Sequence, residues 1–205
     1  IYSIPALRES LTFRGGTALH KLILQPAARY SEDLDFVQSR EAPIGDTLDQ
    51  LRESLEPWLG SPKTQIGHRG ATQIFRFESE TPPIIRLRLK IEINTREHFH
   101  LQPLETRTFE VNSRWFSGSA DIPIYTVSEL LGTKLRALYQ RKKGRDLFDL
   151  WQAGQAGLVI PDQIIAVFQH YMAAEEHTIS RVNFLKNLED KLQSNPFLSD
   201  TPPLL

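Results

Sequence analysis

Residues 11–36 read LTFRGGTALHKLILQPAARYSEDLDF, a sequence that predicts a strand, a glycine turn, a helix and a second strand. It opens with the apolar run Leu11–Phe13, which predicts a short strand leading into the pair Gly15-Gly16. Thr17 is the predicted N-cap of the helix that follows, because its hydroxyl can accept a hydrogen bond from an early backbone N–H. The stretch closes with Asp-Leu-Asp-Phe at 33–36, whose alternation of polar and apolar residues predicts a second strand.

The whole chain has the composition of an ordinary globular protein. It has 205 residues, of which 40% are hydrophobic and 24% charged, with a net charge of −1 and no cysteine. These values exclude disordered and fibrous classes, a disulfide framework and a cysteine nucleophile, and they are compatible with a reducing cytoplasm. No apolar run approaches the roughly 20 residues that span a bilayer, so we expect no membrane segment. Because the net charge of the chain is close to zero, binding of nucleic acid would require a local basic patch.

Downstream, the first 125 residues continue to mix strands and helices. Leucines at helical spacing predict a helix over Thr47–Glu56, and two alternating segments, Thr72–Glu78 and Ile84–Asn94, predict a hairpin with a five-residue loop. From Thr126, which opens a capping box with Glu129, the pattern is mostly helical to an irregular tail. The predicted class is α+β: a small mixed sheet with flanking helices in residues 1–125, followed by a helical region in 126–205.

Three acidic residues are the strongest candidates for chemistry. Asp33 and Asp35 are two residues apart on a predicted strand, so both carboxylates point to the same face. Glu92 lies on the polar face of the strand over 84–94, and three carboxylates from neighbouring strands would suit one or two divalent ions such as Mg²⁺. Two alternatives remain open: a solvated Asp-x-Asp, and a half-exposed Glu92 paired with Lys90 or Arg88.

Two further features bear on anion binding. Gly15, Gly16 and Thr17 form a strand-to-helix turn that could hold a phosphate through free backbone N–H groups, or be an ordinary turn. Lys134 interrupts an apolar helical stripe, so its ammonium either reaches solvent at the helix edge or points into a cleft toward an anion.

A basic cluster surrounds Gly144, formed by Arg141, Lys142, Lys143 and Arg145. It is either a solvated turn or a local patch for triphosphate or RNA. Asp146 and Asp149 share a face of the next helix and could pair with those arginines.

Four segments together resemble the AbiEii/AbiGii toxin family of nucleotidyltransferases, within the DNA polymerase β-like superfamily. They are Phe13–Leu19, Arg29–Phe36, Leu89–Ile93 and Tyr125–Leu150, in this order and on the predicted elements. The resemblance implies a small enzyme that transfers a nucleoside monophosphate from an NTP with two Mg²⁺ ions. It also implies a toxin of a type IV toxin–antitoxin or abortive-infection pair, with a cognate antitoxin as partner and with RNA, particularly tRNA, or a protein as acceptor.

The resemblance assigns roles to single residues. Gly15, Gly16, Thr17 and Ser31 would bind the nucleotide; Asp33, Asp35 and Glu92 would bind metal; Lys134 would steady phosphate charge; and Asp146 would be a further essential acid. Arg14 stands where the family usually has Lys. A kinase-like protein phosphotransferase and a non-catalytic antitoxin-binding module are the alternative functions.

Overall fold

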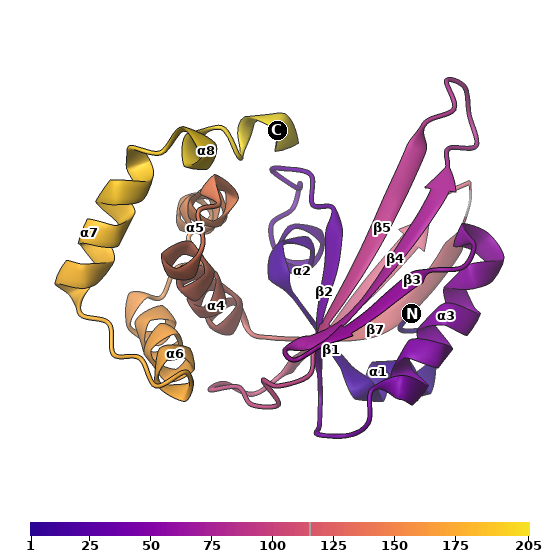
Figure 1. Ribbon diagram of the computed structural model, residues 1–205, viewed down its shortest axis with the longest axis horizontal. Helices are drawn as coiled ribbons and strands as arrows, with labels where there is room; N and C mark the ends of the chain where they lie inside the picture. Colours follow the sequence, from indigo (N-terminus) through magenta and orange to yellow (C-terminus); the bar gives the residue numbers. More distant parts are fainter. Residues whose placement is uncertain (115) are drawn as a thin grey trace. The chain divides into compact units, whose positions relative to one another are not determined.

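A computed structural model describes residues 1–114 and 116–205 (Figure 1). The chain divides into two compact units. The first unit comprises Ile1–Ala18, Glu32–His100 and Leu104–Ile124, and the second comprises Leu19–Ser31, Leu101–Pro103 and Tyr125–Leu205. The long segment of the second unit begins at Tyr125, one residue before the start predicted for the helical region, and nothing in the sequence indicated the two shorter segments.

The first unit is built on a mixed sheet, which has seven strands among the described residues, in the order β3-β4-β5-β2-β1-β7-β6. The strands are β1 (Leu11–Arg14), β2 (Asp33–Gln38), β3 (Lys63–Gly67), β4 (Gly70–Glu78), β5 (Arg86–Asn94), β6 (Glu105–Asn112) and β7 (Ser117–Ile124). Two pairs are parallel, β1 with β7 and β2 with β5, and the other pairs are antiparallel. The mixed sheet confirms the predicted fold class.

One face of the sheet is apolar and carries the core of the first unit. Phe75 on β4 and Ile91 and Ile93 on β5 are at most 2% exposed, as the alternation of the sequence predicts. Two helices, α1 (Pro5–Ser10) and α3 (Gly45–Leu59), lie together on this side, and Gln73 of β4 donates a hydrogen bond to the carbonyl of Leu48 in α3 (Figure 1). The opposite face of β2, β4 and β5 is mostly polar, with Val37 and Ile74 as apolar residues among the polar ones.

Several predicted boundaries in the first unit were wrong. Helix α3 continues through Pro57 to Leu59 and ends at Gly60, whose φ of 72° suits a helix end. The loop of the β4–β5 hairpin has seven residues, 79–85, rather than five, and Ser79 N–H closes it on the carbonyl of Ile85. The sequence pattern also missed α1, β3 and β6, which are short or strongly polar.

Helix α2 (Gly15–Leu22) begins in the first unit and ends in the second. Because it begins at Gly15, Thr17 lies inside its first turn and is not the N-cap predicted from the sequence.

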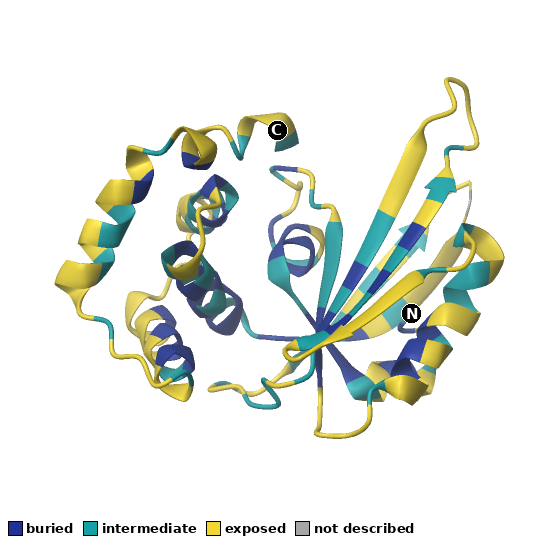
Figure 2. Cartoon of the chain, viewed as in Figure 1, coloured by how far each residue is buried: buried dark blue, intermediate teal, exposed yellow. Residues whose placement is uncertain are grey.

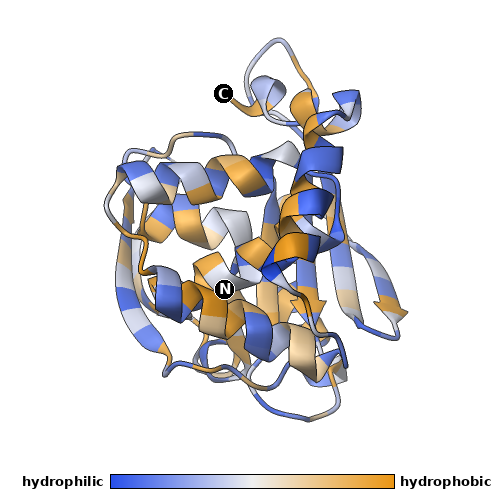
Figure 3. Cartoon of the chain, turned by 90° about the vertical axis from the view of Figure 1, so that its left-hand side faces the viewer, coloured by the Kyte–Doolittle hydropathy of each residue, from blue (hydrophilic) through white to orange (hydrophobic). Residues whose placement is uncertain are grey.

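The second unit is helical. Its helices are α4 (Val127–Gln140), α5 (Gly144–Gln155), α6 (Pro161–Ala174), α7 (Arg181–Leu192) and α8 (Asn195–Leu198), with a 3₁₀ turn at Pro202–Leu204. The tail is thus partly helical rather than irregular. Figure 3 shows hydrophobic and hydrophilic residues alternating along the helices. Helix α4 contacts α5, α6 and α7 and is the most buried of them (Figure 2).

The start of α4 bears out only half of the predicted capping box. Thr126 accepts a hydrogen bond from the backbone N–H of Glu129 at 3.2 Å, which confirms it as the N-cap. The fully buried carboxylate of Glu129 instead accepts hydrogen bonds from the backbone N–H groups of Leu101 and Gln102, at 2.9 and 3.1 Å. Glu129 therefore fixes the short segment 101–103 to the helical unit. None of the helices in the described ranges has the length and apolarity that crossing a bilayer demands.

Candidate active site

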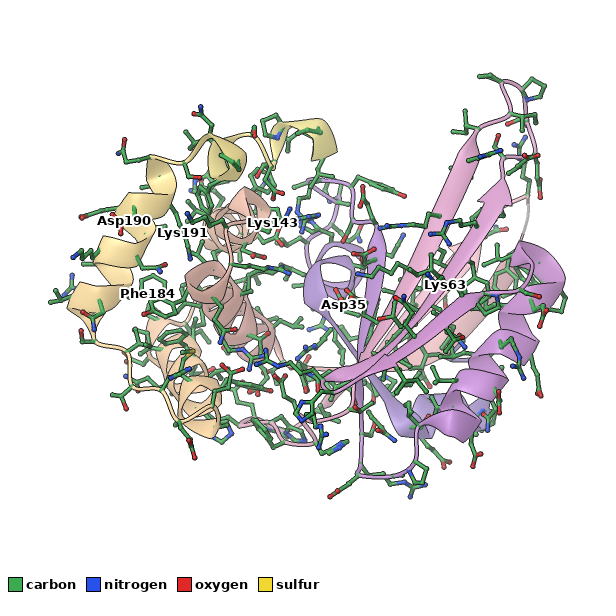
Figure 4. All side chains as sticks on the ribbon, viewed as in Figure 1. Asp35, Lys63, Lys143, Phe184, Asp190 and Lys191 are labelled. Carbon is green, nitrogen blue, oxygen red and sulfur yellow. The ribbon has the colours of Figure 1, made fainter. Side chains whose placement is uncertain are left out.

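Strand register brings the three predicted acids to one face of the sheet. Asp35 on β2 is the direct partner of Glu92 on β5, and Asp33 is the partner of Lys90. Partners in a ladder point to the same face, as do residues two apart on one strand. Asp33, Asp35 and Glu92 therefore share the polar face at the middle of the sheet, where Figure 4 labels Asp35.

Two of these carboxylates are neutralised by basic neighbours on β5. Arg88 Nη2 lies 3.4 Å from Asp33 Oδ1, and Lys90 Nζ lies 2.7 Å from Glu92 Oε1. The side chains of Asp33 and Glu92 are 30% and 43% exposed, so both remain accessible to solutes. The pairing of Glu92 with Lys90 is the alternative that the sequence left open. Glu92 makes this ion pair and still lies on the same face of the sheet as Asp33 and Asp35.

The donor set fits a hard divalent cation in chemistry and in strand register, since it consists of three carboxylates on adjacent positions of one face. Its side chains are not gathered into a cage: within residues 1–114 and 116–205, no three His, Asp or Glu side chains lie close enough to hold a metal ion. Binding of a cation would therefore require Glu92 to leave Lys90 and Asp33 to leave Arg88.

The glycine turn lies directly against Asp35. Gly15 has a φ of +78°, which favours glycine, and an added Cβ would lie 2.8 Å from the Cβ of Asp35 and closer still to its Oδ2. The hydroxyl of the buried Thr17 donates a hydrogen bond to the backbone carbonyl of Asp33. The turn and the carboxylate strand therefore form one tightly fitted piece of backbone. Next to it, Arg14 pairs with Glu97 at 2.7 Å.

In the second unit, Lys134 and Asp146 bind each other. Lys134 is 7% exposed, and its Nζ lies 3.2 Å from Asp146 Oδ1 and 3.0 Å from Asp149 Oδ2. It neither reaches solvent nor stands in an open cleft, because two buried aspartates one helical turn apart on α5 accept its ammonium group. Arg141 completes the partners of Asp146 with bonds of 2.7 and 2.9 Å.

Asp149 is the centre of this buried network. It is fully buried and accepts hydrogen bonds from Arg29 Nε at 2.6 Å, Arg29 Nη2 at 2.7 Å and His20 Nε2 at 2.9 Å. Burial by itself raises the pKa of Asp149, but the bonds from His20 and Arg29 and the charge of Lys134 outweigh it, so the pKa lies well below its usual value. For Asp146, burial is likewise outweighed by Arg141 and Lys134, which lower its pKa.

The basic cluster around Gly144 is largely neutralised. Arg141 binds Asp146, while Lys143 and Arg145 both approach Asp200 at 3.2 and 3.3 Å. These pairs favour the interpretation of the cluster as a structural turn.

Sequence reasoning missed His20, which lies on α2, and Arg29, which lies between α2 and β2; both belong to the segment Leu19–Ser31 of the second unit. The pattern gave no signal for them because their partner, Asp149, is 120 or more residues away. Ser31 ends that same segment and is half-buried. The nucleotide-binding role predicted for Ser31, like those of Lys134 and Asp146, stays a prediction.

A mixed sheet with a glycine turn beside an Asp-x-Asp strand and a third acid on the parallel neighbour is the arrangement expected of a nucleotidyltransferase core. The comparisons agree. The family model "Nucleotidyl transferase AbiEii toxin, Type IV TA system" matches residues 2–203, so the chain belongs to the AbiEii family of nucleotidyltransferase toxins of type IV toxin–antitoxin systems. No curated protein sequence gives a significant match.

The fold is shared by solved structures, among them the two that follow. The nucleotidyltransferase toxin MenT4 from Mycobacterium tuberculosis H37Rv matches with a TM-score of 0.60 at 18% identity, over 94% of this chain and 76% of that protein. JHP933 from Helicobacter pylori matches with a TM-score of 0.51 at 20% identity, over 95% of this chain and 71% of that one. At such identities the likeness shows the fold alone.

Proposed function

We propose that the chain transfers a nucleoside monophosphate from an NTP to the hydroxyl of an RNA acceptor, with release of pyrophosphate, and that the transfer requires Mg²⁺. The observation that carries this is the β2–β5 register, which puts Asp33, Asp35 and Glu92 on one accessible face beside the Gly15 turn. Membership of the AbiEii family supports an NTP as substrate and an antitoxin as partner. The acceptor and the metal are parts of the proposal.

Each group of residues has a role in this reaction. Gly15, Gly16 and Thr17 would bind the triphosphate through backbone N–H groups at the start of α2, where the helix dipole favours an anion. Asp33, Asp35 and Glu92 would hold the metal. Bound there, Mg²⁺ would supply positive charge against the triphosphate and lower the pKa of the acceptor hydroxyl. Most of the catalytic effect would come from positioning and electrostatics.

The role proposed for Lys134 is that of a cation for phosphate charge, with Asp146 as its counter-ion. Because Asp146 and Asp149 hold its ammonium group, this role requires Lys134 to turn away from them. Their 3.2 Å contact supports treating the two residues as one functional pair. Both substrates are cytoplasmic molecules, so we propose that the protein acts in the cytoplasm.

The test is transfer of label. The protein is incubated with each of four α-³²P NTPs, Mg²⁺ and total tRNA, with a parallel series from γ-³²P ATP. We expect label from the α position in RNA, and its loss in Asp35→Asn. Glu53→Gln, an exposed carboxylate change on α3, is the matched control and should transfer normally.

Other outcomes decide between the alternatives. Label from the γ position in protein would replace this proposal with a kinase-like reaction. Equal transfer by wild type and Asp35→Asn would remove Asp35 from the site. If NTP and Mg²⁺ neither transfer label nor raise the melting temperature, the chain is a binding module, since a ligand of the native state must stabilise it.

A further inference from the structure

A row of basic side chains continues from the carboxylates along the β4–β5 hairpin. On β5, Arg86, Arg88, Lys90 and Glu92 follow each other at every second position, so all four point to the face that carries Asp35. On β4, Arg76 is the direct partner of Arg88, and it shares this face.

The row extends to the edge strand of the sheet. Lys63 on β3, labelled in Figure 4, is the partner of Ile74, which lies two residues before Arg76 on β4 and hence on the same face. We call Lys63, Arg76, Arg86, Arg88 and Lys90 the basic stripe. Its outer members, Lys63, Arg76, Arg86 and Arg88, are exposed, as is the end of the hairpin in Figure 2.

Only part of the positive charge of the stripe is neutralised by the protein: Arg88 and Lys90 pair with Asp33 and Glu92, and Glu78 on β4 is the strand partner of Arg86. Within the described part of the chain, no carboxylate lies at salt-bridge distance from Lys63, Arg76 or Arg86. The cluster around Gly144 differs, because Asp146 and Asp200 bind its members. Arg76 and Arg88 stand directly opposite each other on adjacent strands, an arrangement that costs stability through like-charge repulsion unless an anion lies between them.

The shape of this region suits an extended anion. Arg76, Arg86 and Arg88 line a hollow together with Phe77, Glu78 and Leu87. Glu92 follows Arg86 by six positions, which at about 3.3 Å per residue is roughly 20 Å of strand. That is longer than one triphosphate, whereas successive basic positions about two residues apart suit the phosphates of a nucleic acid backbone.

We propose that the basic stripe binds the phosphodiester backbone of the RNA acceptor and leads its terminal hydroxyl toward Asp35 and Glu92. This rests on the proposed function for the identity of the acceptor. Arg88 and Lys90 belong both to the basic stripe and to the candidate active site, because each pairs with a carboxylate of that site. An RNA phosphate that takes over Arg88 or Lys90 releases Asp33 or Glu92 for metal, so the acceptor and Mg²⁺ favour each other's binding.

The experiment measures binding of a fluorescein-labelled 12-nucleotide single-stranded RNA by anisotropy, at several salt concentrations and without NTP. The test variant is Arg76→Gln/Arg86→Gln. The control is Arg8→Gln/Arg52→Gln, which removes two exposed arginines from α1 and α3, the helices on the opposite face.

We expect the test variant to bind at least tenfold more weakly at 100 mM salt. Its slope of log K against log salt should be smaller by about 1.4, since each lost phosphate contact on a single strand changes the slope by about 0.7. The control should match wild type in affinity and slope. Stabilisation by ATP and Mg²⁺ should be the same in all three proteins, because the triphosphate would be held at the glycine turn.

The failures are distinguishable. If the test variant and the wild type bind RNA equally while α-label transfer is intact, the RNA-binding role of the basic stripe is refuted and the proposed function stands. If polyglutamate of matched charge binds as tightly as RNA and with the same loss in the test variant, the stripe serves an acidic protein and the RNA assignment is overturned. If the wild-type protein binds no RNA, the RNA-binding role of the basic stripe is refuted as well. The proposed function is then tested by the transfer assay alone.

Discussion

Asp149 offers the sharpest test of what stabilises the helical unit. Its carboxylate is fully buried and accepts from Arg29, His20 and Lys134. In Asp149→Asn the side chain keeps its size but loses its charge, which leaves the guanidinium of Arg29 buried without a counter-ion. Removing one partner of a buried ion pair costs about 3–5 kcal/mol.

The expected loss is large enough for a simple assay. In a chain of this length about 2–4 °C of melting temperature corresponds to 1 kcal/mol, so thermal unfolding at pH 7, followed by circular dichroism at 222 nm, should shift down by about 6–20 °C. Asp190→Asn, an exposed change on α7, is the control and should shift unfolding free energy by no more than about 0.5 kcal/mol.

The pH dependence of the difference follows from the lowered pKa of Asp149. A carboxyl with a depressed folded-state pKa contributes stability that is fully present above the unfolded pKa of about 3.9 and is lost as pH falls through the folded pKa. The difference in unfolding free energy between wild type and Asp149→Asn should therefore be constant from pH 7 to about 5 and become smaller below about pH 4. A gap under 1 kcal/mol at pH 7, or one that widens in acid, would refute this account of the network.

Three smaller predictions concern the first unit and the start of α4. Gly15→Ala should displace the adjacent carboxylate and reduce nucleotidyl transfer about a hundredfold, while Gly45→Ala, whose added methyl meets nothing within 4 Å, should leave transfer unchanged. Thr126→Ala removes a helix cap and should lower the unfolding free energy in urea by about 1 kcal/mol. Lys90→Gln should tighten Mg²⁺ binding about two- to fivefold by calorimetry, because it frees Glu92 from a partly exposed ion pair; unchanged affinity would contradict the competition.

Predictions from the sequence were most accurate for features that depend on a single strand or helix. Alternation over 84–94 separated the buried Ile91 and Ile93 from the polar face, and the cap at Thr126 depends on a neighbour three residues away. Short and polar elements such as β3 and β6 were missed, since their strands gain stability from a neighbouring strand rather than from their own apolar residues.

The local pattern of this chain by itself determined that Asp33 and Asp35 face the same way, and that an acid at 92 stands on a polar face. The parallel pairing of β2 with β5, which puts Asp35 opposite Glu92, became visible only in the folded chain, as did the contacts of Lys134 and Arg29 with Asp149. The physical reason is range. Side-chain direction follows from backbone geometry within a few residues, whereas strand partners and buried counter-ions are set by packing between segments that are distant in the chain.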